Sequence, residues 1–417
     1  MPSVMQPWRN SFMSTSQHFI LLRDLNQGRR FTGLSSPSLP YPGVRSFGLE
    51  PAADLPPEPA ISLETLSPAD LRDAARDPDV LGVARSMPTR LISPTPSDAP
   101  GAPAAAATGP TWGVRAVGAD RSSFDGSGVS VAILDTGIDR NHPAFAGMAI
   151  TELDFSGDGD GDVNGHGTHC AGTVFGRDVD GQRIGVARGV STALIGKVLG
   201  DQGGGGSEML FNGMEWAIRN NAQVLSMSLG FDFPGLAANL ISQGWPEALA
   251  TSAALEGYRM NLRMFDRLLA MLEARAAFNG GTVVVAASGN ESRRPQFELS
   301  ASVPAAALGV LSVGALGEGP SGFTVASFSN TNPVLAAPGV NVVSAATGGG
   351  LTALNGTSMA APHVAGVAAL WWQAIRERGV PVNAGAVQAR LRAMASLDGL
   401  APDQDVLDRG DGMVQAP

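Results

Sequence analysis

The sequence predicts an α/β protein with three layers, a mostly parallel central sheet carrying helices on both faces, preceded by a small α+β N-terminal unit. The main observation lies after residue 112, where short apolar runs rich in β-branched residues alternate with helical stretches. That pattern is typical of a parallel sheet covered by helices on both faces. The chain has 417 residues, 44% of them hydrophobic, which is enough to build a large core.

The N-terminal unit, residues 1–91, is predicted as a strand, a helix and a second strand. Ser67 can cap the helix, and Asp70 three residues later completes a capping box. A unit this small buries little surface by itself, so we expect it to pack against the rest of the chain. The predicted elements are a strand at 19–24, a helix at 67–78 and a strand at 79–87.

Residues 92–111 predict a linker, because Pro, Ala, Ser and Gly follow one another there without periodicity. The second part of the chain, 112–417, holds the predicted sheet. Several of its strands end in small polar motifs (LDTG, SMSLG and AASGN), and the active site of such a sheet lies beyond the carboxyl ends of its strands. The predicted strands are 129–137, 191–200, 221–230 and 281–290, and the predicted helices are 211–220, 247–278 and 359–378.

The amino-acid composition argues against several classes of function. The net charge is −10 and we find no basic cluster, which argues against a nucleic-acid partner. Lys197 is the only lysine, so Schiff-base chemistry or a serine–lysine pair would have to depend on that residue. Cys170 is the only cysteine and permits no internal disulfide.

Targeting signals are not evident. Residues 1–24 contain no apolar core of signal-peptide length. No apolar run reaches the roughly 18 residues that a membrane helix needs. We therefore expect no membrane span and no secretion signal, which leaves the cytoplasm or a non-classical export route.

Three residues have the types that serine-based acyl transfer requires, namely a hydroxyl, a base and an orienting carboxylate. Asp135 ends the apolar run VAILD. His166 lies in NGHGTH and Ser358 in LNGTSMAAPHVAG, both where a helix is expected to begin. Because strand ends and helix starts meet at one edge of such a sheet, these three side chains are candidates for one catalytic site.

The segments around these residues resemble the three catalytic signatures of the subtilisin-like serine proteases, and Asp, His, Ser is also the order known for subtilisin. A cysteine near the histidine resembles the branch of proteinase K and thermitase. The resemblance covers 112–417, and its motifs are DTGID (135–139), HGTHCAG (166–172), SLG (228–230), SGN (288–290) and GTSMAAPHVAG (356–366).

The resemblance implies a serine endopeptidase that needs no cofactor for its chemistry. Ser358 would be the nucleophile, His166 the general base and then acid, and Asp135 the group that orients the imidazole. Asn290 matches the side-chain donor of the oxyanion hole, together with the backbone N–H of Ser358. A catalytically silent module that binds extended peptides is the alternative.

The resemblance also implies a substrate cleft and two partners, polypeptide substrates and the chain's own N-terminal unit. That unit resembles the family's pro-domain, which assists folding and then occupies the cleft, so we predict self-cleavage between Leu91 and Thr111. An uncleaved inhibitory domain is the alternative. No wall of the S1 pocket is acidic, which predicts an apolar or neutral P1 side chain. The substrate-binding candidates are Ser228, Leu229, Gly230, Ala287, Ser288 and Gly289.

Cys170 and the remaining histidines of this part are expected to be structural. Cys170 follows His166 by four residues, which places both on one helix face. A cysteine–histidine nucleophile pair is therefore conceivable, but it would leave the Ser358 motif without a role. The histidines expected to pack or hydrogen-bond are His142, His169 and His363.

Two segments leave alternatives open. Asp158, Asp160 and Asp162 alternate with glycine like the start of a calcium loop, but no glutamate follows at the twelfth position. A structural calcium and a solvated acidic loop are the two readings. The segment at about 231–280 is longer than the helix that the family usually has there. The alternatives are that it narrows substrate specificity, that it docks a partner, or that it is an added helical pair on the surface.

Overall fold

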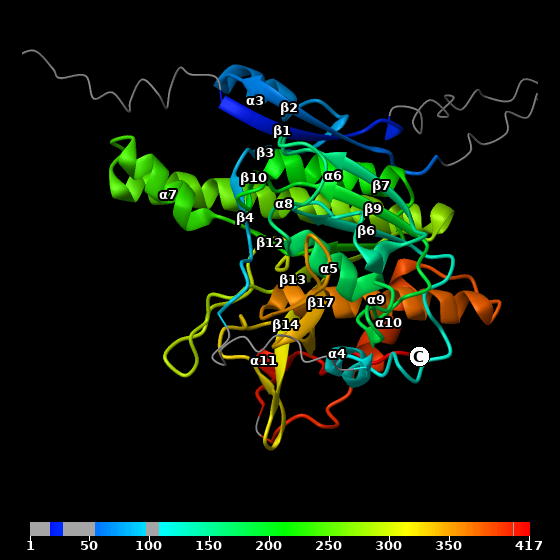
Figure 1. The fold of residues 1–417 in the computed structure, drawn as a ribbon. Helices are drawn as coiled ribbons and strands as arrows, with labels where there is room; N and C mark the ends of the chain where they lie inside the picture. Colours follow the sequence, from blue (N-terminus) through cyan, green and yellow to red (C-terminus); the bar gives the residue numbers. More distant parts are fainter. Residues whose placement is uncertain (1–16, 28–54, 97–107, 403) are drawn as a thin grey trace, which may run out of the picture.

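The computed structural model describes residues 17–27, 55–96, 108–402 and 404–417. The predicted α/β class is confirmed, because a mostly parallel central sheet lies between two layers of helices (Figure 1). A second, small sheet, coloured blue in Figure 1, sits against one of these layers. The expectations for the first 16 residues and for most of the linker lie outside the described residues.

The central sheet has eight strands in the order β15-β14-β13-β11-β6-β9-β7, with β16 also paired to β14. All pairs are parallel except β14 with β15. Each of the four predicted strands of this part contains one of its strands. The bounds are β6 Ser130–Asp135, β7 Ala149–Asp154, β9 Thr192–Lys197, β11 Val224–Met227, β13 Val283–Ala287, β14 Val310–Gly319, β15 Gly322–Val325 and β16 Leu335–Pro338.

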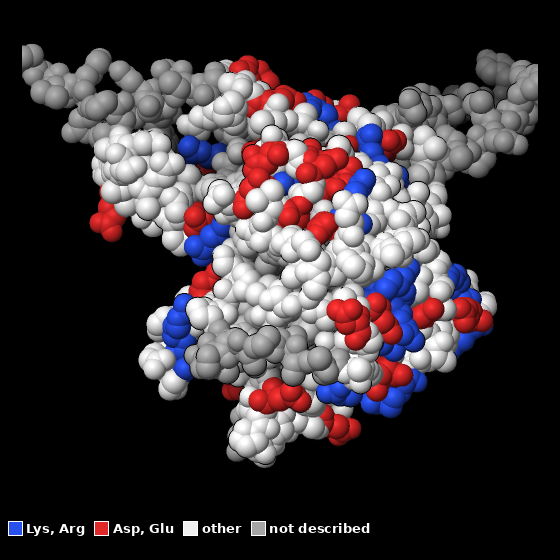
Figure 2. Space-filling view, in the orientation of Figure 1, with Lys and Arg blue, Asp and Glu red and all other residues white. Residues whose placement is uncertain are grey.

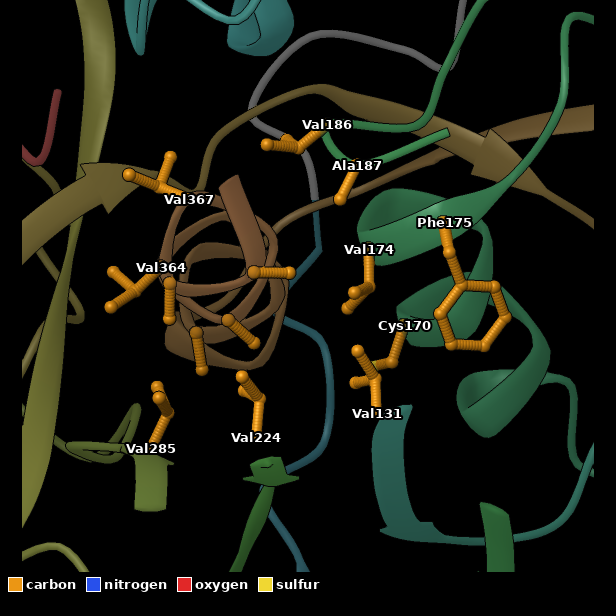
Figure 3. Close-up of a cluster of buried hydrophobic side chains, with 14 of the residues drawn as sticks. Val131, Cys170, Val174, Phe175, Val186, Ala187, Val224, Val285, Val364 and Val367 are labelled. Carbon is orange, nitrogen blue, oxygen red and sulfur yellow. The ribbon is translucent and has the colours of Figure 1, made fainter. Parts of the chain in front are cut away.

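Both faces of this sheet are buried, which explains why its strands are continuous apolar runs. On β6, Val131 and Ile133 belong to one core, whereas Ala132 and Leu134 belong to the other. Figure 3 shows the first core, where strand valines lie beneath helices α9 and α5. The helices of that layer are α5 His166–Phe175, α9 Thr357–Glu377 and α10 Ala384–Ala393, and those of the opposite layer are α6 Ser207–Arg219 and α8 Glu247–Asn279.

The small sheet is formed by β1 (Gln17–Asp24) between β2 (Pro59–Leu66) and β3 (Val80–Arg85), all antiparallel. Helix α3 (Pro68–Ala74) has the predicted capping box, with Ser67 and Asp70 bonding each other's backbone N–H. It ends at Ala74 and is therefore shorter than the predicted helix at 67–78.

This small unit rests on α6 and α8, as its size predicts. Asn261 of α8 donates to the carbonyl of Arg85 at 2.8 Å. The backbone N–H of Ile61 donates to the carboxylate of Glu215 on α6 at 3.0 Å. The unit therefore shares its core with the second part of the chain.

The chain leaves the small sheet after β3 and forms a further strand, β4 (Pro88–Leu91). This strand pairs antiparallel with β10 (Gly204–Gly206) on one side and with β12 (Leu229–Phe231) on the other. In Figure 1 it runs down from the small unit beside β12. The end of the N-terminal unit is thus built into a three-stranded sheet of the second part.

The predicted insertion, 231–280, forms a helical pair. Helix α7 (Phe233–Ser242) packs against α8, a helix of 33 residues that confirms the predicted helix at 247–278. Because β3 lies across α8, this pair is partly covered by the N-terminal unit. The remaining elements are β5 Gly109–Pro110, α4 Trp112–Ala116, η1 Pro143–Phe145, β8 Gln182–Arg183, β17 Val342–Ala345, β18 Leu351–Leu354 and α11 Val406–Arg409.

The surface is mixed in charge on the face shown in Figure 2, where acidic side chains gather in the upper half and basic ones intersperse with acidic ones below. Within the described parts of the chain, no helix has both the length and the apolar character required to cross a bilayer.

Candidate active site

Asp135 and His166 form a buried pair at the carboxyl edge of the sheet. Asp135 is the last residue of β6 and His166 the first of α5. The chain enters α5 through Gly165, whose φ of 92° is one that glycine adopts readily. His166 Nδ1 lies 2.8 Å from Asp135 Oδ1 and donates to it, since a carboxylate only accepts. The carboxylate therefore fixes the orientation of the imidazole.

The environment of His166 favours the protonated ring. Burial lowers the pKa of His166, but the adjacent Asp135 carboxylate outweighs burial and holds this pKa well above its ordinary value. Burial also raises the pKa of the Cys170 thiol, so that neighbour is neutral near pH 7. The site is arranged to stabilise the imidazolium that forms when the ring accepts a proton.

Ser358 lies at the start of α9 but is not hydrogen-bonded to His166 in this state. Its Oγ donates to the carbonyl oxygen of Ile92 at 2.8 Å. The Nε2 atom of His166 is buried and has no hydrogen-bond partner within the described residues. The cleft is thus occupied by the chain's own Ile92, and the serine–histidine hydrogen bond is not made.

Pro362 lies inside α9, which begins at Thr357, and not in the first turn of the helix. A proline removes the N–H that would bond the carbonyl four residues earlier. That carbonyl belongs to Ser358 and accepts from Ser228 Oγ and Cys170 Sγ instead, each at 3.4 Å.

Asn290 is held so that its amide donor faces the cleft. Its Oδ1 accepts from both the N–H and the Oγ1 of Thr357, each at 2.9 Å. Its Nδ2 donates to the carbonyl of Ser93 at 2.9 Å. The role of Thr357 was not predicted, although its place beside the serine in GTSMAAP was a signal that could have indicated it.

The segment in the cleft is bound as an extended strand. Arg90 pairs with Gly230 on one side and Gly204 on the other. The N–H of Ile92 donates to the carbonyl of Ser228 at 3.2 Å. The register places the peptide bond between Ile92 and Ser93 at Ser358, a pairing that no local sequence pattern indicated.

The comparison with known families decides the classification. The model of the subtilase family matches residues 126–411, which include Asp135, His166 and Ser358 and lie within the predicted extent of the resemblance, 112–417. The chain belongs to the subtilase family. By this membership the chain is classed with the subtilisin-like serine proteases.

Individual relatives are fungal. Subtilisin-like protease 1 of Trichophyton equinum is 31% identical over 344 residues, 78% of this chain and 56% of the relative. Subtilisin-like protease 1 of Trichophyton rubrum is 32% identical over 305 residues, 69% of this chain and 50% of the relative. Subtilisin-like protease 6 of Trichophyton equinum is 34% identical over 270 residues, 62% of this chain and 57% of the relative. The chain spans about half the length of the curated relatives it matches.

The predicted S1 residues of this subtilase are buried, and one of them lies close to the Ile92 side chain. The buried Ile92 side chain belongs to the same apolar cluster as Ala287, and a Cβ added to Gly230 would lie 3.9 Å from its Cγ1. Leu229 is buried in β12. Ser288 is buried, and Gly289 adopts a φ of 116°, where a side chain would meet Asn330. The Ile92 side chain therefore lies close to Gly230, one of the residues predicted to line the S1 pocket.

Cys170 occupies the predicted face of α5, with its Sγ 3.7 Å from His166 Nδ1. That nitrogen is already engaged by Asp135, whereas the unpartnered Nε2 is the one that a nucleophile would use. The buried thiol also has a raised pKa because of desolvation. The geometry therefore favours the packing role over a cysteine–histidine nucleophile.

The other three buried histidines of the second part each have a local backbone partner. His142 Nδ1 accepts from the N–H of Ala144. His169 Nε2 lies 3.0 Å from the carbonyl of Val342, and His363 Nδ1 lies 2.8 Å from that of Met359. None of these contacts reaches the Asp135–His166 pair, which agrees with the predicted structural roles.

The burial of two of these histidines predicts that the folded chain loses stability in acid. Burial lowers the pKa of His169 to about 3 and that of His363 to about 4, against 6.5 in the unfolded chain. The folded state thus keeps both rings neutral, so their contribution to stability is full above pH 6.5 and is lost progressively as the pH falls toward 4. Each ring contributes about 1.4 kcal/mol per pH unit in this window.

Urea unfolding of the Ser358→Ala chain, which avoids autolysis, measures this effect. The free energy of unfolding is expected to be several kcal/mol lower at pH 5 than at pH 6.5, an interval in which the raised pKa of His166 has little effect. His363→Gln is expected to weaken this pH dependence, whereas equal free energies at the two pH values would contradict the account.

The three aspartates of the predicted calcium loop do not share one role. Asp162 accepts from Thr136 Oγ1, from the N–H of Gly165 and from both the N–H and the Oγ1 of Thr168, so it anchors the first turn of α5. Asp158 accepts from a backbone N–H at 2.9 Å, and Asp160 is exposed. In the described parts of the chain, the one group of three metal-ligating side chains that converge is Asp135, His166 and Cys170.

Calcium at Asp158, Asp160 and Asp162 stays a prediction. If calcium binds, EDTA is expected to lower Tm by several degrees, because a ligand at 100 times its Kd adds about 2.7 kcal/mol. Differential scanning fluorimetry with and without EDTA measures this, and added calcium but not magnesium should restore Tm. An unchanged Tm would leave the acidic loop as a solvated surface feature.

Proposed function

We propose that this subtilase is a serine endopeptidase made as a precursor that occupies and then cuts its own cleft segment. The observation that carries the proposal is the contact between Ser358 Oγ and the Ile92 carbonyl, next to the buried Asp135–His166 pair. The bond cut would be Ile92–Ser93, which lies within the stretch from Leu91 to Thr111 where self-cleavage is predicted.

The chemistry follows from the positions of these groups. Ser358 Oγ attacks the Ile92 carbonyl carbon while His166 Nε2 takes the hydroxyl proton, and Asp135 stabilises the resulting imidazolium. His166 then returns the proton to the nitrogen of Ser93, which leaves as a free amine. Water hydrolyses the acyl-enzyme by the same route, with His166 again acting as the base.

The oxyanion would be held by Asn290 Nδ2 and the backbone N–H of Ser358. In the occupied state, Asn290 donates to the neighbouring Ser93 carbonyl instead. A small shift of the segment is therefore needed to bring the Ile92 oxygen to Asn290 and to free Ser358 for His166. We infer that the precursor is held in a state before attack, in which the Ile92 oxygen has not reached Asn290 and Ser358 has not bonded to His166.

The N-terminal unit, 1–91, would act as a pro-domain joined to the catalytic part, 112–417, through the linker 92–111. Its support is the strand pairing of β4 and the shared core with α6 and α8. After the cut, β4 would remain in the cleft as a product-like inhibitor. An uncleaved inhibitory domain would make the same contacts but keep the Ile92–Ser93 bond.

The substrates would be polypeptides with an apolar P1 side chain. Ile92 would be the P1 residue of the cleft segment, which its place beside Gly230 supports. The residues predicted to line S1 include no acidic group; they are Ser228, Leu229, Gly230, Ala287, Ser288 and Gly289. Casein digestion with mass spectrometry of the products tests this preference, and cleavage mainly after Arg or Lys would overturn it. Loss of casein hydrolysis after treatment with a serine-directed fluorophosphonate separates a protease from a silent peptide-binding module.

Replacing Asn290 with alanine is expected to lower kcat by about 10²–10³-fold with little change in KM, because its amide donor acts on the charge that develops during attack. This range is the one known for subtilisin and is carried over from it. Thr357→Val, which removes one of the two bonds that orient Asn290, should have a smaller effect. Steady-state kinetics on a chromogenic peptide measures both, and near-normal kcat in Asn290→Ala would contradict the assignment.

A further inference from the structure

We propose that Asp232 and Glu291 form an acidic subsite of the cleft that selects substrates with an arginine or lysine at P3. The inference rests on the proposed function, since it takes Ile92 as P1 and therefore Arg90 as P3. It concerns Arg90, the one basic side chain of β4.

The guanidinium of Arg90 lies between two carboxylates. Its Nη1 is 3.7 Å from Asp232 Oδ1, and its Nη2 is 3.3 Å from Glu291 Oε1. The backbone of Arg90 pairs with Gly230, so its position relative to the scissile bond is fixed. Both carboxylates belong to the part of the chain that would remain when β4 leaves.

The two carboxylates are positioned without help from Arg90. Asp232 caps α7, where its Oδ1 accepts from the N–H of Gly235 at 3.0 Å. Glu291 accepts from Asn330 Nδ2 at 2.8 Å through its other oxygen, and its own N–H donates to Asn330 Oδ1. Departure of β4 would therefore leave two fixed negative charges facing the P3 position.

The surroundings suit a long basic side chain. Arg90 borders a pocket of about 300 Å³. Its wall includes Phe231, Phe233 and Tyr258, and the last two rings are 6.2 Å apart with their planes nearly perpendicular. Such rings pack against the methylene stem of arginine or lysine and attract its cation. Phe233 and Tyr258 come from the enlarged 231–280 segment, which gives that segment a role in specificity.

The solvent exposure of the three charged side chains determines how strong a preference for arginine we expect at P3. The Arg90 side chain is 48% exposed, Asp232 25% and Glu291 39%. Ion pairs this open to solvent are weakened by water and by salt. We expect about a fivefold preference in kcat/KM for arginine over a neutral isostere, declining as NaCl is raised.

The test uses the cleft sequence itself, as a fluorogenic peptide PTRLISP and the same peptide with citrulline in place of arginine. Citrulline keeps the shape and removes the charge. With the purified full chain, the ratio of kcat/KM for the two peptides is expected to be about five. A ratio near one would overturn the subsite.

Variants that remove one charge each test whether the preference for arginine depends on Asp232 and Glu291. Asp232→Asn and Glu291→Gln keep acceptor oxygens for Gly235 and Asn330 but remove the charges, so each should move the ratio toward one. Glu298→Gln is the matched control, because Glu298 is an exposed carboxylate that pairs with Arg294 and does not line the pocket. The same loss of ratio in Glu298→Gln would overturn the local assignment.

A second readout does not require turnover. In the Ser358→Ala chain, Arg90→Gln is expected to speed hydrogen exchange of the β4 amides about fivefold, whereas Arg76→Gln, on the exposed end of the N-terminal unit, should not. If wild type cuts neither peptide and also keeps its Ile92–Ser93 bond, the proposed function fails. If it has cut that bond but cuts neither peptide, β4 still blocks the cleft, and in both cases the exchange result alone decides the subsite. Unchanged exchange in Arg90→Gln would then overturn it.

Discussion

Replacing Ser358 with alanine is expected to lower kcat by about 10⁶-fold, the loss that removal of the nucleophile causes in subtilisin. The physical reason is that the Ser358 hydroxyl, which is bonded to the Ile92 carbonyl, is the proposed nucleophile. Fold and stability should be retained, because the Ser358 side chain is bonded only to the Ile92 carbonyl. Hydrolysis of a chromogenic peptide and labelling by a fluorophosphonate measure the effect.

Cys170→Ala is the matched control for this variant. Its thiol is the other nucleophilic atom beside His166, at 3.7 Å from Nδ1, and its removal is expected to leave kcat within a few-fold of wild type. Activity that survives in Ser358→Ala and disappears in Cys170→Ala would contradict the serine mechanism and support the cysteine–histidine alternative.

Replacing Asp135 with asparagine is expected to lower kcat by about 10⁴-fold, the size of effect known for the equivalent change in another serine protease. An amide at this position can donate to Nδ1, which places the ring proton on Nε2 and prevents that atom from accepting the Ser358 proton. The same change removes the charge that raises the pKa of His166.

The pH profile provides the decisive readout for Asp135. His166 acts as a base only when neutral, so the kcat/KM of wild type should fall on the acid side through a pKa above 6.5. In Asp135→Asn, that acid limb should move to lower pH. Asp139→Asn is the control, since Asp139 lies in the same DTGID motif but bonds only to loop N–H groups. An unchanged acid limb in Asp135→Asn would contradict the assignment.

The parts of this fold that could be predicted are those with a local signature. Asp135 follows a strand of continuous apolar residues, and His166 and Ser358 start helices, so local patterns placed all three at one edge of a parallel sheet. The capping box at Ser67 was equally visible. Each of these features depends on residues close together in the chain.

The structural features that could not be predicted depend on contacts between segments far apart in the sequence. The register of β4 between β10 and β12 determines that Ile92 meets Ser358, yet PTRLISP has no periodicity that reveals a strand in a cleft. Asp162 was grouped with its neighbours by spacing, but its contacts with Thr136 and Thr168 arise only when α5 docks on the sheet.

The central claim is that this subtilase cuts its own Ile92–Ser93 bond with Ser358. N-terminal sequencing of the purified wild-type chain and of Ser358→Ala tests it most directly. The account predicts a new N-terminus at Ser93 in wild type and its absence in Ser358→Ala. The same N-terminus in both proteins, or a wild-type cut outside the stretch from Leu91 to Thr111, would contradict it.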